Sequence, residues 1–250
     1  MNLCRGLILA FACLLVGSCA RESRGLYSLK WAEKPRHTKP IKSVPPDRRL
    51  SFQKIATFNQ NDSDFYQIQN QIREGDVIAY HMKTNEARLE VLKGKLTRAG
   101  YRLFDYGHLA IVCRPPEAKG LRLFSSESFK GPNTREAVAS LETHSFDLYR
   151  LNQWDRLDRE KFYEFIAASQ QKAGNWKGYD FSGMFALWNS NLEPSSPKEI
   201  GRDYICSTVV AAALYYAGAD LRVSRRAGLL DLVSPRQVVT AHGLLRPTIL

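Results

Sequence analysis

A glycine and a histidine precede five apolar residues in the stretch Gly107-His108-Leu109-Ala110-Ile111-Val112-Cys113. An apolar run of this length is typical of a buried β-strand. The residues Arg114-Pro115-Pro116 must end the strand, because proline cannot donate to a sheet ladder. We therefore expect a buried strand that carries a polar side chain, His108, at one end of a sheet.

On either side of this strand the chain alternates between strand and helix patterns. Strands are predicted at residues 77–80, 101–106, 121–124 and 145–149. Helices are predicted at residues 62–73, 155–173, 204–217 and 234–242. Residues 86–98 fit either a helix or a hairpin. Strands that are followed and flanked by helices predict an α+β domain, with an antiparallel sheet covered by helices on one face.

The composition describes one ordinary globular domain or at most two small ones. The chain has 250 residues, of which 44% are hydrophobic and 11% aromatic. It can therefore bury enough surface to offset the entropy lost on folding, which excludes disorder throughout. A polytopic membrane protein is excluded because the sequence lacks an apolar run of about 18 or more residues. The net charge of +11 suggests a nucleic-acid partner, and the position of the charges decides whether that interpretation holds.

The first 19 residues have the pattern of a bacterial lipoprotein signal. Arg5 precedes the ten apolar residues 7–16, and small residues follow before Cys19. The segment is too short to span a bilayer and is typical of a secretory signal. Its end, Val16-Gly17-Ser18-Cys19, resembles a lipobox, which implies removal of residues 1–18 and acylation of Cys19. Ordinary cleavage that leaves Cys19 as a plain thiol is the alternative. Acylation predicts anchorage to a bilayer in the bacterial cell envelope, at the inner or the outer membrane.

Residues 19–50 have the composition of a basic, proline-interrupted linker. Residues 20–50 hold nine Lys or Arg, three acids and four prolines, a net charge of +6. The predicted catalytic domain, residues 51–250, keeps a net charge of only +4. A basic tether beside an acyl chain can lie against anionic lipid headgroups, and a merely soluble spacer is the alternative. The lack of a readout motif and the predicted secretion argue against a nucleic-acid partner.

Three cysteines remain after removal of the signal: Cys19, Cys113 and Cys206. This is too few for the dense disulfide framework of a small secreted domain, although a bond between Cys113 and Cys206 stays open. The sequence holds no Cys or His cluster with zinc spacing, so we expect neither a metal nor another cofactor.

Cys206 lies at the start of the apolar helix predicted at 204–217. A helix N-terminus presents unpaired N–H groups and the positive end of the helix dipole, so we expect the pKa of this thiol to be lowered. His108 is the candidate base, because Cys and His partners meet in space and not in sequence. Glu127 follows the strand at 121–124 and could accept from the His108 ring. His81 competes with His108 for the role of base, and a buried structural cysteine is the alternative for Cys206.

The order of three short motifs resembles the circularly permuted papain-like enzymes of the NlpC superfamily, of the YaeF/YiiX type, which are related to lecithin-retinol acyltransferase-like proteins. The motifs are Gly75-Asp76 before a strand, Gly107-His108 opening a strand, and Tyr204-Ile205-Cys206-Ser207 opening a helix. The resemblance covers roughly residues 55–240. In permuted members the His strand precedes the Cys helix, as it does here.

The resemblance implies a permuted papain-like fold in which the Cys helix packs against an antiparallel sheet. It implies Cys206 as nucleophile, His108 as base and Glu127 as the polar third member. Residues with expected roles in substrate binding are Tyr80, Tyr204, Ser207 and Asp180. One departure concerns the pocket: relatives often carry a glutamate two residues after the Cys, and this chain has Thr208.

The sequence thus predicts a lipid-anchored cysteine hydrolase that cleaves amide bonds through an acyl-enzyme, with a peptide, cell-wall or acyl-lipid substrate. One alternative is a lipid ester hydrolase or acyltransferase on the same fold. The other is a non-catalytic lipoprotein that binds cell-wall or lipid fragments.

Overall fold

The computed structural model describes residues 44–60, 62–81, 106–127, 130–173, 191–201, 204–223 and 233–246. The predictions for the signal, for Cys19, for most of the linker and for Asp180 lie outside these ranges. So do the helix or hairpin at 86–98 and the strand at 101–105.

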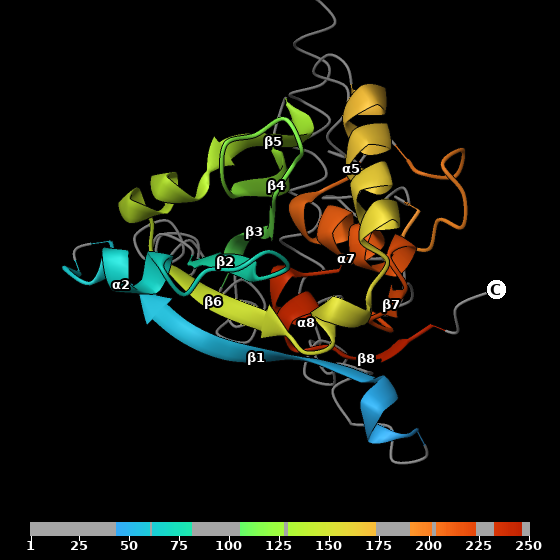
Figure 1. Cartoon of the computed structure of the whole chain (residues 1–250), viewed down its shortest axis with the longest axis horizontal. Helices are drawn as coiled ribbons and strands as arrows, with labels where there is room; N and C mark the ends of the chain where they lie inside the picture. The colour runs from blue at the N-terminus through green and yellow to red at the C-terminus, as the bar shows by residue number, and fades with distance from the viewer. Residues whose placement is uncertain are drawn as a thin grey trace, which may run out of the picture.

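One antiparallel sheet organises the described part of the chain (Figure 1). Its strands are β1 (Arg49–Phe58), β2 (Val77–His81), β3 (Tyr106–Cys113), β4 (Arg122–Glu127), β5 (Gly131–Ala137), β6 (Phe146–Leu151), β7 (Ala219–Asp220) and β8 (His242–Leu245). They lie in the order β5-β4-β3-β2-β6-β1-β8-β7. The sheet and the helices beside it confirm the α+β class.

The helices lie beside the sheet in two groups. The α-helices are α2 (Phe65–Gln69), α5 (Arg159–Ala173), α7 (Cys206–Tyr216) and α8 (Pro235–Val239), and the 3-10 turns are η1 (Pro46–Arg48), η2 (Val138–Thr143) and η3 (Trp154–Arg156). Helices α5, α7 and α8 cover one face of the sheet, and α2 and η2 lie on the other (Figure 1). Within the described ranges no helix is long and apolar enough to cross a membrane.

Both faces of the central strands are buried, which corrects the expectation of a sheet covered on one face. Leu109 and Ile111 of β3 belong to the apolar cluster beneath α5, α7 and α8. Ala110 and Val112 belong to a second cluster beneath α2 and η2. Because side chains alternate along a strand, burial on both faces requires the unbroken apolar run of β3.

The structure also corrects several predicted boundaries. The helix predicted at 62–73 is confined to α2, and the one predicted at 155–173 begins at Arg159 after the turn η3. The helix predicted at 234–242 ends at Val239, so that His242 opens β8.

Four strands have no counterpart among the sequence predictions: β1, β5, β7 and β8, of which β1 and β5 are the longest. The first, β1, begins at Arg49, inside the predicted linker, and Leu50 is 1% exposed where β1 pairs with β8. The second, β5, reads GPNTREA and holds a proline. It lies at the edge of the sheet, where a missing backbone N–H costs no ladder bond.

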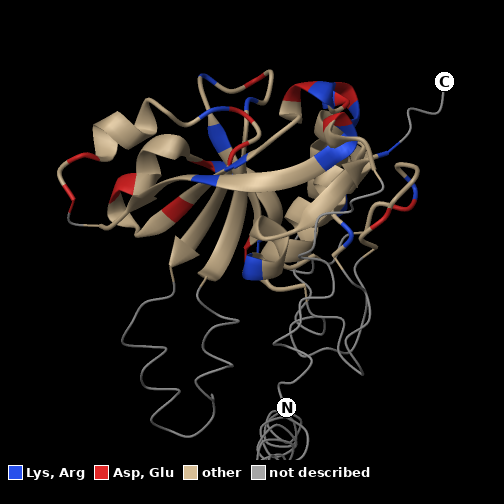
Figure 2. Cartoon of the chain, turned by 90° about the horizontal axis from the view of Figure 1, so that it is seen from below, with Lys and Arg blue, Asp and Glu red and all other residues tan. Residues whose placement is uncertain are grey.

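Acidic and basic residues alternate along the described part of the chain without gathering on one element (Figure 2). This fits the net charge of +4 for residues 51–250, which is small for a chain of that length.

Candidate active site

The N-terminal end of α7 lies between the outer ends of β3 and β4. The pairing of these strands runs from Cys113 opposite Arg122 to Ile111 opposite Phe124. Further along, the hydroxyl of Ser126 in β4 donates to the carbonyl of Tyr204 at 2.5 Å. On the other side, the backbone N–H of Leu109 in β3 donates to the sulfur of Cys206. The first residue of α7 therefore occupies the gap where the two strands separate.

The Cys206 thiol is buried and receives backbone N–H groups of Leu109, Ser207 and Cys206 itself. Burial nevertheless raises the pKa of the thiol to about 11, against the lowering effect of these donors. This corrects the expectation of a lowered pKa, because desolvation outweighs the helix N-terminus. The resting thiol is thus protonated at neutral pH, while its surroundings are arranged to stabilise negative charge once a proton leaves.

Thr208 caps the helix that carries Cys206. Its hydroxyl accepts from the N–H of Ile205 at 3.0 Å and contacts the carbonyl of the same residue at 3.1 Å. This hydrogen bond satisfies the N–H of Ile205 at the start of the helix, as the side chain of the third residue does in a capping box. Thr208 therefore has a structural role, which is to stabilise the start of α7.

His108 lies on β3 directly before the residue whose N–H binds the Cys206 sulfur. Its ring contacts the ring of Tyr80, with centroids 5.4 Å apart, and Tyr80 in turn contacts His144 at 5.3 Å. Burial is the main cause that lowers the pKa of His108 to about 4; the charge of Glu127 opposes this shift and His144 adds to it. The imidazole is therefore neutral at pH 7 and able to accept a proton.

Glu127 ends β4 and faces two partners that the sequence analysis did not identify. Its carboxylate accepts from the Lys130 ammonium at 2.6 Å and from the side chain of Asn133. Burial acts to raise the pKa of Glu127, but these hydrogen bonds and the charges of Lys130 and His108 lower it overall. Glu127 thus acts on His108 through its charge, and its hydrogen bonds go to Lys130 and Asn133.

The residues expected to bind substrate divide into two kinds. Tyr80 borders His108. Tyr204 and Ser207 are both fully buried. The Tyr204 hydroxyl accepts from Gly201 at 2.9 Å and donates to Asn191 at 3.1 Å, and the Ser207 hydroxyl donates to the carbonyl of Val233. These two side chains fix the start of α7 and are not exposed to a substrate.

The competing histidine, His81, belongs to a different cluster. Its Nε2 lies 3.1 Å from Oδ1 of Asp147. The same oxygen accepts from the Thr57 hydroxyl at 2.7 Å, and Oδ2 lies 2.8 Å from the Lys54 ammonium. The hydroxyl of Tyr106 donates to the same carboxylate. Burial acts to raise the pKa of Asp147, but the four hydrogen bonds together hold it well below its usual range. The ring of His81 is therefore held by the buried carboxylate of Asp147.

Replacing Asp147 with Asn is expected to lower the free energy of unfolding at pH 7 by about 3 kcal/mol, because Lys54 and the buried donors lose their charged acceptor. A depressed pKa in the folded state stabilises the fold above the unfolded value of about 3.9, and this contribution is lost as the pH falls through the folded value. Urea unfolding should therefore show a difference between wild type and Asp147→Asn that shrinks below about pH 4.

The matched control is Asp155→Asn, which removes an exposed partner of Arg159. It should cost less than about 1 kcal/mol. Equal losses in the two variants, or a loss in Asp147→Asn that does not change with pH, would contradict this description of the cluster.

Cys113 and Cys206 are both free, so the disulfide that the sequence left open is absent from the structure. Cys113 lies at the opposite end of β3, where its sulfur donates to the carbonyl of Arg122 at 3.6 Å. Among the described residues, no group of three or more His, Cys, Asp and Glu side chains could hold a metal ion.

Comparison of the chain with models of protein families, with curated proteins and with solved structures finds no match. Its own residues must therefore carry any conclusion about function. Lys130, Asn133 and Asp147 are the polar contacts that the sequence analysis missed. A charged residue inside the apolar strand pattern of 145–149 was the available signal for Asp147.

Proposed function

We propose that the protein is a cysteine hydrolase that cleaves amide bonds, anchored to a membrane through an acylated Cys19. One observation carries the proposal: the Cys206 sulfur, at the start of an 11-residue helix, binds the N–H of Leu109, the residue after His108. The imidazole of His108 and the carboxylate of Glu127 lie at this end of β3 and β4, with the His108 ring against Tyr80 on the face of β3 that carries Ala110 and Val112. A thiol, a base and a carboxylate are the groups that acyl transfer through a thioester uses.

The reaction follows from the resting protonation states. His108 takes the proton of the Cys206 thiol as the sulfur attacks the carbonyl carbon of the amide. The C–N bond breaks when the departing amine takes the proton from His108, which leaves a thioester on Cys206. Water then gives a proton to His108 and attacks the thioester, so that the acid leaves and the thiol regains its proton. The N-terminal end of α7 favours the negative charge that develops beside it.

Replacing His108 with Gln is expected to reduce kcat/KM for an amide or activated ester by about 10²- to 10⁴-fold, the usual contribution of a general base. In the wild type, kcat/KM should fall as the pH drops below about 4, because His108 is then protonated and cannot accept a proton. It should stay level across neutral pH. A pH series of initial rates measures both effects.

His81→Gln is the matched control, since it removes a second histidine whose ring is held by Asp147. It should keep the rate and the pH profile of the wild type, once circular dichroism confirms the fold. Loss of activity in His81→Gln together with full activity in His108→Gln would transfer the role of base to His81.

A non-catalytic lipoprotein of the same fold is the second candidate. The raised pKa and low exposure of the Cys206 thiol favour it, because a buried, protonated thiol is a weak nucleophile until a base removes its proton. The two candidates differ in whether an acyl group is ever transferred to Cys206.

A further inference from the structure

A polar pocket of about 310 Å³ opens between β5 and the C-terminal end of α5. It is lined by Lys130, Pro132, Asn133, Thr134, Arg135, Gln170 and Ala173. None of these residues carries a negative charge, and two carry a positive one. The pocket is at the lower end of the size range of small-molecule sites, and its volume suits one or two amino-acid residues or a similar small group.

Arg135, like Lys130, is an exposed cation of this pocket. Its backbone is fixed, because its N–H donates to Asn133 at 3.2 Å and its carbonyl accepts from Arg122 at 3.3 Å. Within the described ranges no carboxylate forms an ion pair with its guanidinium. A planar guanidinium in this state offers a fork of N–H donors that matches a carboxylate.

The remaining polar side chains of the pocket are held in place by one another. Asn133 is buried and donates to the carbonyl of Gly131 at 2.9 Å. The side-chain N–H of Gln170 in α5 donates to the hydroxyl of Thr134 in β5 at 3.0 Å. Amide and hydroxyl groups of this kind bind the N–H and C=O groups of a peptide.

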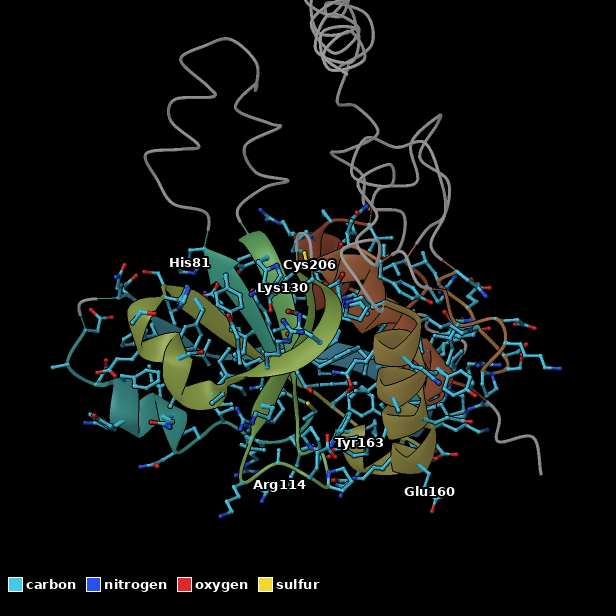
Figure 3. All side chains as sticks on the ribbon, turned by 90° about the horizontal axis from the view of Figure 1, so that it is seen from above. His81, Arg114, Lys130, Glu160, Tyr163 and Cys206 are labelled. Carbon is cyan, nitrogen blue, oxygen red and sulfur yellow. The ribbon has the colours of Figure 1, made fainter. Side chains whose placement is uncertain are left out.

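Two lining residues connect the pocket to the candidate active site. Lys130 and Asn133 both bind the carboxylate of Glu127, which acts on His108. Figure 3 shows Lys130 and Cys206 at the same end of the molecule, and Arg114 and Tyr163 at the opposite end. A group bound in the pocket therefore lies one side chain away from Glu127.

We propose that this pocket binds a carboxylate of an acidic peptide substrate, with Arg135 as the principal specificity-determining residue and Lys130 as the second cation. The proposal rests on the proposed hydrolase function and names its substrate class: peptides with an acidic side chain or a terminal carboxylate near the bond that is cut. A cationic pocket beside Glu127 selects such peptides over neutral ones, because an isosteric amide leaves the guanidinium without a charged partner.

The test compares two probes, acetyl-Ala-Glu-amide and its neutral isostere acetyl-Ala-Gln-amide, by calorimetry on the full chain with Cys206→Ala. The acidic probe should bind about tenfold or more tightly than the neutral one, as expected for hydrogen bonds to a charged group. Arg135→Gln should remove this preference. Arg114→Gln, at the opposite end of the molecule, should keep it.

Equal affinity for the two probes, or an unchanged preference in Arg135→Gln, overturns the proposal. So does binding of inorganic phosphate or of phosphatidylglycerol vesicles with no binding of the acidic probe, because the anion recognised is then a phosphate and the substrate a lipid. Binding is measured without hydrolysis, so the two ideas fail separately. If the pocket prefers the acidic probe but Cys206 is never acylated, the binding site stands and the hydrolase proposal fails. If the protein hydrolyses substrates and does not prefer the acidic probe, the hydrolase proposal stands and the binding-site proposal fails.

Discussion

Replacing Cys206 with Ala is expected to lower the rate of hydrolysis of a p-nitrophenyl ester or an anilide by at least about 10³-fold. In the proposed mechanism the sulfur is the atom that forms the thioester, and backbone N–H groups of Leu109 and Ser207 bind it. His108 retains its place on β3 in the variant. The residual rate of the variant then measures the hydrolysis by water that His108 and the surrounding N–H donors support without the thiol. Initial rates at pH 7 with purified wild type and variant measure the effect.

The chain offers a matched control in Cys113, the second buried free cysteine of the described residues. Burial raises the pKa of this thiol to about 12, and the thiol lies at the far end of β3. Cys113→Ala should therefore keep the rate of the wild type, while both variants lose a little stability from the removed sulfur. Full activity in Cys206→Ala would remove the thiol from the mechanism.

Replacing Gly75 with Ala is expected to lower the free energy of unfolding by at least about 3 kcal/mol, or to prevent folding. Gly75 has φ +85°, a backbone conformation that residues with a side chain rarely adopt. A Cβ atom here would lie 2.1 Å from the buried ring of Trp154. The turn also places Asp76, whose carboxylate binds Arg150 at 2.8 Å, at the start of β2. Urea unfolding followed by circular dichroism measures the loss.

Gly120→Ala separates the two causes of this loss. Gly120 has a similar positive φ, +101°, and a Cβ atom there meets nothing within 4 Å. Only the backbone term remains, so the expected cost is about 1 to 2 kcal/mol. Equal losses at the two glycines would show that the contact with Trp154 contributes nothing.

Local sequence patterns were sufficient where burial dictates the residues. The strands β2 and β3 are buried on both faces, so they are continuous apolar runs that can be recognised without knowledge of their partners. The helix α7 is apolar on all sides for the same reason and ends at Gly218, which has φ +104°.

Elements whose form depends on distant partners escaped prediction. The strand β1 alternates imperfectly, because its register shifts between Lys54 and Ala56. The strand β5 contains Pro132 and charged residues, and it exists because β4 offers it a partner at the sheet edge. The predicted linker boundary at residue 50 differs from the structure for the same reason, since β8 pairs with β1 at Arg49.

The candidate site shows the same division. The helix start at Cys206 and the strand position of His108 follow from sequence. The direction of the thiol pKa does not, because it depends on how completely the helix N-terminus is desolvated between β3 and β4. The partners of Glu127 come from the hairpin to β5, so they could not be named before that strand was known.

The intact mass of the protein after a brief reaction with a p-nitrophenyl acyl ester, quenched with acid, tests the hydrolase proposal most directly. We expect the wild type to gain one acyl group, carried by the peptide that contains Cys206, and to lose it on longer incubation as water hydrolyses the thioester. Cys206→Ala should gain none, and His108→Gln should gain it slowly. A wild-type protein that stays unmodified under conditions of turnover, or one that carries the acyl group on Cys113 or a lysine, would contradict a nucleophilic Cys206.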